Sequence, residues 1–97
     1  MTELEVACRR VGAESLETDW ACDVAIDVDG ASTRHVVTVR AADLRRLDAS
    51  ASDPHDLVDR SFRFLLEREP ATSILGRFDL MEIARYFPEF EATIRDV

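Results

Sequence analysis

The chain has 97 residues, of which 46% are apolar and 33% charged, with a formal net charge of −8. This length fits one domain with a modest core, and the composition excludes a disordered chain. No apolar run approaches the roughly 20 residues that a membrane span needs, and the N-terminal residues show no secretory signal pattern. We therefore expect a single domain over residues 1–97 that is cytoplasmic and has no membrane partner.

The acidic excess is even along the chain. Residues 1–40 contain 8 acidic and 4 basic residues, and residues 41–97 contain 12 and 8. Proteins that bind nucleic acid neutralise phosphates with clustered Lys and Arg, and this sequence has no basic tail or stripe. The charge pattern therefore predicts that nucleic acid is not a partner.

Residues 3–10, "ELEVACRR", alternate between apolar and polar positions, which predicts a strand. If this strand pairs antiparallel with the next one, Cys8 can face Cys22 on the apolar side. A cytoplasmic setting keeps thiols reduced, so we expect two buried thiols that act as small apolar side chains.

The stretch "AIDVDGASTRHV" resembles half of a calcium loop because Asp27 and Asp29 precede Gly30. The first and twelfth places of an EF-hand loop require acidic ligands, and here they hold Ala25 and Val36. The stretch is therefore not a calcium loop of that kind.

A β-hairpin explains the same residues better. Asp-Gly is a preferred two-residue connection because both positions of a type I′ turn need a positive φ. Residues 20–28 and 33–39 alternate on either side of it, with their apolar positions on one face. A two-residue turn would pair Val24 with His35, and a four-residue turn would pair Ile26 with His35. In both registers His35 lies on the apolar face.

The pattern becomes helical after Arg40. Asp53-Pro54 is a start signal for a helix over residues 54–69, and Pro70 stops that helix. Asp79 followed by Glu82 resembles a capping box for a further helix that ends near Pro88, and a last short helix follows it. The apolar positions that we assign to the buried faces of the first two of these helices are Leu57, Val58, Phe62, Leu65, Leu66, Leu80, Ile83, Ala84 and Phe87.

These elements together predict an α+β fold. A three-stranded antiparallel β-meander over residues 1–40 is followed by three to four helices over residues 41–97, in the order β-β-β-α-α-α. The helices pack on one face of the sheet because each strand has one apolar face.

The run "SFRFLLEREP…SILGRFDLMEIARYFPEF" resembles a C-terminal segment of small bacterial proteins without a known activity. The resemblance covers about a third of the chain. It implies a bacterial origin and a recurring helical unit, and it implies no catalytic role.

The sequence offers no catalytic, cofactor or metal motif. Ser61 and His55 are six residues apart on the same helix, so they do not share a turn as a nucleophile and its base would. The glycines are scattered and form no phosphate loop, and no metal-ligand spacing occurs. We therefore expect no catalytic, cofactor or metal site, and an enzyme is the less favoured class.

Binding is the favoured class. Aromatic residues, Met and Arg are enriched at protein interfaces, and the candidate interface residues are Met81, Tyr86, Arg85 and Phe90. We expect a protein-interaction or regulatory module whose partner is another protein or a second copy in a homodimer. The alternative is a small enzyme or ligand-binding domain with a pocket between sheet and helices, where His35 is the candidate polar residue.

Overall fold

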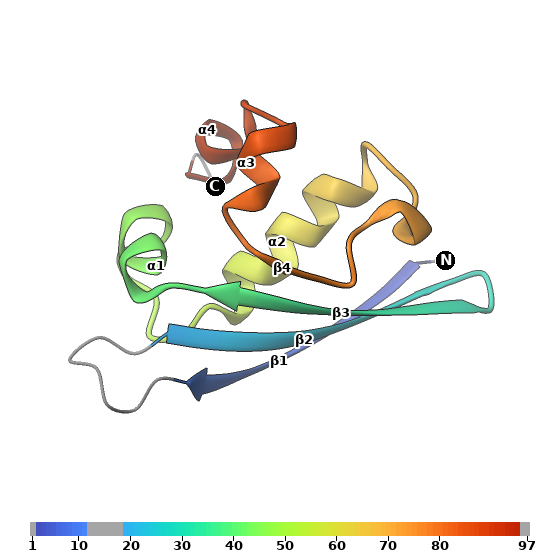
Figure 1. Cartoon of the computed structure of the whole chain (residues 1–97), viewed down its shortest axis with the longest axis horizontal. Coiled ribbons are helices and arrows are strands. Elements are labelled where there is room, and N and C mark those ends of the chain that lie inside the picture. The colour runs from blue at the N-terminus through green and yellow to red at the C-terminus, as the bar shows by residue number, and fades with distance from the viewer. Residues whose placement is uncertain (1, 12–18, 96–97) are drawn as a thin grey trace.

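A computed structural model of the chain describes residues 2–11 and 19–95. The strands β1 (Thr2–Val11), β2 (Asp19–Val28) and β3 (Ala31–Val39) are antiparallel neighbours. The helices α1 (Ala41–Leu47), α2 (His55–Leu66), α3 (Glu82–Tyr86) and α4 (Phe90–Arg95) lie on one side of the sheet, as Figure 1 shows. The predicted α+β class and the helices on one face are confirmed.

The sheet has a fourth strand that the sequence analysis did not predict. Strand β4 (Arg77–Asp79) pairs parallel with β3, which makes the sheet order β1-β2-β3-β4. The Val36 N–H donates to the Gly76 carbonyl and the Leu80 N–H donates to the Thr38 carbonyl. The expectation of three antiparallel strands is therefore wrong in this detail, because β4 satisfies backbone groups that β3 would otherwise leave open at an edge.

The hairpin between β2 and β3 has the two-residue turn. Val28 pairs with Ala31 and Val24 with His35, which is the first of the two predicted registers. Asp29 has φ 48° and Gly30 has φ 87°, as a type I′ turn requires. The side chain of Asp27 accepts a hydrogen bond from the hydroxyl of Ser32, its partner across the hairpin, next to the turn.

The predicted register between β1 and β2 is also confirmed, since Cys8 lies directly opposite Cys22. The expectation that both cysteines stay free thiols is wrong, because the structure joins them in a disulfide across Cα atoms 4.0 Å apart. The short separation is that of a pair without mutual backbone hydrogen bonds, where side chains approach most closely. A disulfide persists in oxidising compartments, so the bond weighs against the cytoplasmic location, which stays a prediction.

The core lies between the sheet and the helices. Val24, Ile26 and Cys22 on β2 are at most 1% exposed, and α2 covers this face. Helix α2 begins at His55, one residue after the predicted first position, and ends at Leu66, three residues before the predicted end. Its His55 N–H donates to the Asp53 carboxylate. The other buried apolar residues that complete the core include Val37, Val39, Leu57, Val58, Phe62, Phe64, Leu65, Leu80, Ile83, Phe90 and Ile94. No helix in the described part of the chain is long and apolar enough to cross a membrane.

Candidate functional site

An apolar groove lies where the end of α2, the segment that follows it and α3 meet. Helix α2 ends at Leu66, and Pro70 precedes a short 3-10 turn, η1 (Ala71–Ser73), which leads into an extended loop before β4. This path encloses a groove of about 370 Å³. The residues that line it are Leu65, Glu69, Ser73, Ile74, Leu75, Phe78, Glu82, Ile83, Tyr86 and Phe87.

The groove has a buried apolar floor and two exposed apolar walls. Leu65, Ile74 and Ile83 are buried beneath it. Leu75 is 51% exposed and Tyr86 is 67% exposed, and these are the large apolar side chains that the described residues expose. Both of them line this groove, so exposed apolar surface is concentrated at one place rather than scattered.

The charged members of the lining are both acidic. Glu69 and Glu82 line the groove, and the lining includes no basic residue. The Arg85 guanidinium donates to the Glu82 carboxylate at 3.2 Å, but Arg85 itself lies outside the lining. The Arg68 guanidinium lies over the Phe64 ring, 3.6 Å from its centroid, and also forms ion pairs with Glu67 and Glu89. The charged groups of the lining are therefore two carboxylates, of which Glu82 is paired with Arg85.

His35 lies on the core face of β3, as predicted, and it supports the groove. It is 4% exposed, and its ring centroid lies 5.6 Å from that of Phe62. Its Nδ1 lies 2.8 Å from the Leu75 carbonyl oxygen, and its Nε2 lies 2.9 Å from the Thr33 hydroxyl. A carbonyl oxygen only accepts, so Nδ1 carries a hydrogen and donates it. His35 thus holds the loop that presents the Leu75 side chain to solvent.

The structure separates the predicted interface residues into two groups. Tyr86 and Arg85 are exposed on α3. Phe90 is fully buried and packs edge-on against Phe64 with ring centroids 5.2 Å apart. Phe90 therefore belongs to the core and is not a surface residue. Its helical spacing with Ile94 defines a face of α4, and the face is turned inward.

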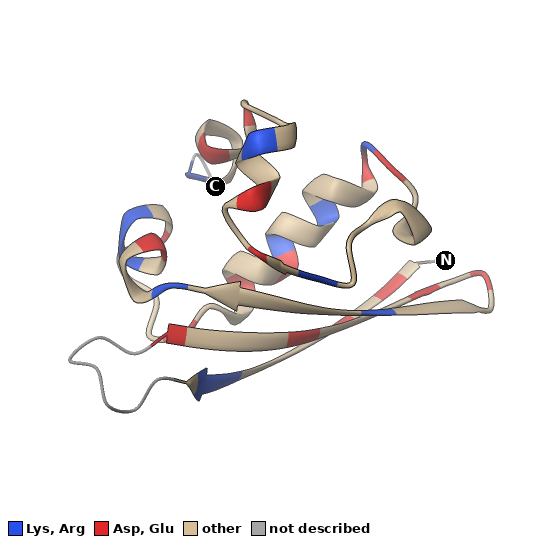
Figure 2. Ribbon diagram, viewed as in Figure 1, with Lys and Arg blue, Asp and Glu red and all other residues tan. Residues whose placement is uncertain are grey.

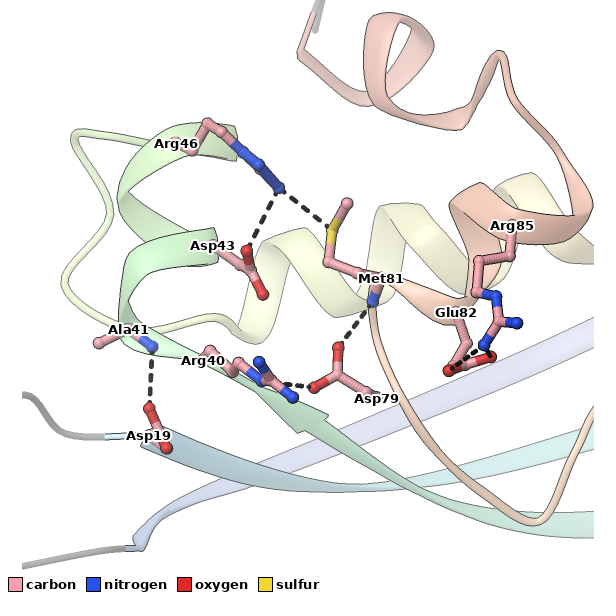
Figure 3. A network of polar contacts seen from close by, with 9 residues as sticks. All are labelled: Asp19, Arg40, Ala41, Asp43, Arg46, Asp79, Met81, Glu82 and Arg85. Carbon is pink, nitrogen blue, oxygen red and sulfur yellow. Dashed lines mark hydrogen bonds and ion pairs between the residues drawn. The ribbon is translucent and has the colours of Figure 1, made fainter.

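Met81 is half-buried within a polar network that fixes the approach to α3 (Figure 3). The Arg46 guanidinium from α1 donates to the Met81 sulfur at 3.4 Å and to Asp43 at 3.2 Å. The Asp79 carboxylate accepts from the Met81 N–H at 3.0 Å and from Arg40 at 3.1 Å. Asp79 thus caps the turn that leads into α3, close to the predicted capping role. Met81 stabilises this junction and does not line the groove.

Leu75 is the member of the site that the sequence analysis missed. It lies in a loop with no periodicity, next to Ile74, which is 7% exposed. The apolar pair Ile74-Leu75 lies between Pro70 and Gly76, two residues that interrupt regular secondary structure. An extended backbone points adjacent side chains to opposite sides, and this alternation is the signal that could have identified Leu75.

A second, broader hollow lies between the sheet and α2, where the alternative function was expected. Its lining includes both histidines, together with Leu4, Val6 and Asp59. His35 uses both ring nitrogens for the structural contacts described above, and His55 pairs with the adjacent Asp56 at 3.2 Å. Ser61 is fully buried and donates its hydroxyl to the Leu57 carbonyl. Residues 2–11 and 19–95 contain no group of three or more side chains that could hold a metal ion.

Comparisons of the chain with protein-family models, with curated proteins and with solved structures found no match.

Proposed function

We propose that this chain is a protein-interaction module whose groove binds a short segment of a partner protein. The observation that carries the proposal is that Leu75 and Tyr86, the exposed large apolar side chains of the described residues, line one groove. Tyr is enriched among residues that dominate binding energy, because its ring offers a large contact area at low entropic cost. The volume of about 370 Å³ accommodates side chains rather than a whole domain.

The charge of the groove defines the chemistry of the segment that it fits. Glu69 and Glu82 would face a residue that flanks the apolar anchor. A basic residue there gains a favourable interaction, and an acidic one is repelled. The proposed ligand is therefore a peptide segment with one or two large apolar side chains beside Arg or Lys.

Selection from a random peptide library on the folded protein tests this function. We expect the selected peptides to combine apolar anchors with a neighbouring basic residue. In fluorescence anisotropy, Tyr86→Ala should weaken the binding of such a peptide by about tenfold or more, as expected for an interface hot spot. Circular dichroism should show that Tyr86→Ala still folds, because the side chain is 67% exposed.

Two charge reversals in the segment that follows α2 provide a matched comparison. Glu69 lines the groove, whereas Glu67, two residues earlier, does not. We expect Glu69→Arg to weaken peptide binding and Glu67→Arg to leave it unchanged. Selected peptides that bind Tyr86→Ala and Glu69→Arg as tightly as the unmodified chain would show that the groove is not the binding site.

A further inference from the structure

The outer edge of β1 is a long strand edge with open hydrogen-bonding groups. In the sheet order β1-β2-β3-β4, no strand of the described residues pairs with the outer side of β1. Strand β1 has ten residues, whereas β4 at the opposite edge has three. A long open edge is a template for a further strand, so the question is which strand fits it.

The register with β2 identifies the backbone groups that point outward. The close Cα separation of Cys8 and Cys22 marks a pair without mutual backbone hydrogen bonds. Because a strand repeats every two residues, the other even-numbered residues of β1 have the same backbone orientation as Cys8. Their N–H and C=O groups therefore point away from β2, toward the open edge. Among these, Leu4 and Val6 also have half-buried side chains on the core face, and an added strand would cover them further.

The acidic and basic residues of β1 occupy different halves of the strand. Its first half contains Glu3 and Glu5 and its second half Arg9 and Arg10, and Figure 2 shows acidic colour near the start of the strand and basic colour near its end. A parallel copy of the same strand would place like charges together. An antiparallel copy places acidic residues against basic ones, which is the favourable arrangement.

We infer that two copies of this chain pair through their β1 edges, antiparallel about a two-fold axis. With the axis beside Ala7, Val6 pairs with the partner's Cys8 through backbone hydrogen bonds. Glu5 then faces the partner's Arg9 on the open side of the sheet, and the same contact occurs twice by symmetry. Each chain offers one such edge, so the assembly closes as a dimer with one continuous eight-stranded sheet.

Two reciprocal charge reversals test this pairing. Glu5→Arg leaves Arg facing Arg at both symmetry-related contacts, and Arg9→Glu leaves Glu facing Glu. Each variant alone should dimerise at least about tenfold more weakly than the unmodified chain in sedimentation equilibrium. An equimolar mixture of the two variants should form heterodimers, because both contacts then join Arg to Glu.

The controls separate folding from pairing. Arg9→Glu removes the ion pair with Asp23 and brings two carboxylates together, but both positions are more than half exposed, so the change should cost little stability. Circular dichroism and urea titration of each variant check this. Glu67→Arg makes the same charge change directly after the end of α2, away from β1, and it should leave the dimer intact.

Three results would overturn the inference: a monomeric unmodified chain at every concentration measured, an undiminished dimer in Glu5→Arg, or a mixture of the two variants that stays monomeric. Because β1 does not contribute to the groove lining, loss of the dimer does not depend on whether the groove binds a peptide.

Discussion

Replacing His35 with Phe tests whether this histidine holds the groove loop. Phe preserves an aromatic ring beside Phe62 and removes both polar contacts of the imidazole. The Leu75 carbonyl then loses the hydrogen-bond donor that His35, which is only 4% exposed, provides. Leaving a part-buried acceptor without a donor costs about 1–2 kcal/mol, the lower part of the range for a fully buried group. The half-buried Thr33 hydroxyl can rotate to another partner, so we assign most of the loss to the carbonyl.

Urea unfolding measures this loss of stability. Small proteins have urea m-values of about 1–3 kcal/mol/M, so a loss of about 1–2 kcal/mol lowers the midpoint by roughly 0.5–1 M. The other histidine supplies the control: His55 is exposed on the first turn of α2, and His55→Phe should change stability by less than about 0.5 kcal/mol.

Amide exchange locates the effect. The Val36 N–H donates to the Gly76 carbonyl, next to the loop that His35 holds. We expect faster exchange of the Val36 amide in His35→Phe, with little change in amides between β1 and β2. An unchanged urea midpoint together with unchanged exchange of Val36 would refute the role that we assign to His35.

Two further substitutions test the disulfide and the core. Joint replacement of Cys8 and Cys22 by Ser removes a cross-link between residues 14 apart in the chain. We expect the free energy of unfolding in urea to fall by about 3 kcal/mol. Equal stability of the variant and the oxidised protein would show that the bond contributes nothing to the fold. Phe62 is fully buried between His35 and Phe78, so Phe62→Ala should cost about 3–5 kcal/mol in the same assay through lost contacts and a cavity, and a loss below 1 kcal/mol would contradict the packing described above.

The hairpin could be predicted from the sequence because its signals are local. The turn requires positive φ at two adjacent positions, and Asp29-Gly30 is a pair that tolerates it. The alternation on both sides then places His35 on the core face with either a two-residue or a four-residue turn. The start of α2 was predictable for the same reason, since Asp53 caps an N–H two residues away.

Strand β4 could not be predicted in this way. Its three residues are too short to show a period, and its partner β3 lies about 40 residues earlier in the chain. The Asp79 side chain was interpreted as part of a capping box, and it does accept the Met81 N–H. The parallel pairing depends on backbone groups of β3 that no local pattern reveals.

Helical spacing also left the candidate surface incomplete. It identifies which residues share a face, but not which neighbouring element covers that face. Phe90 and Tyr86 are both aromatic residues of the C-terminal helices, yet Phe90 packs on Phe64 and Tyr86 extends into solvent. The difference arises from where α2 lies, which is a tertiary property of the chain.

The two proposed surfaces lie at opposite edges of the sheet. The groove is built next to β4 and includes Phe78 from that strand, whereas the proposed dimer contact is the outer edge of β1, on the far side of β2 and β3. Pairing through β1 therefore leaves the groove of each copy open. If both proposals hold, the dimer presents two identical grooves on one continuous sheet. A partner with two apolar and basic segments would then be held by avidity, since binding of the first segment raises the effective concentration of the second.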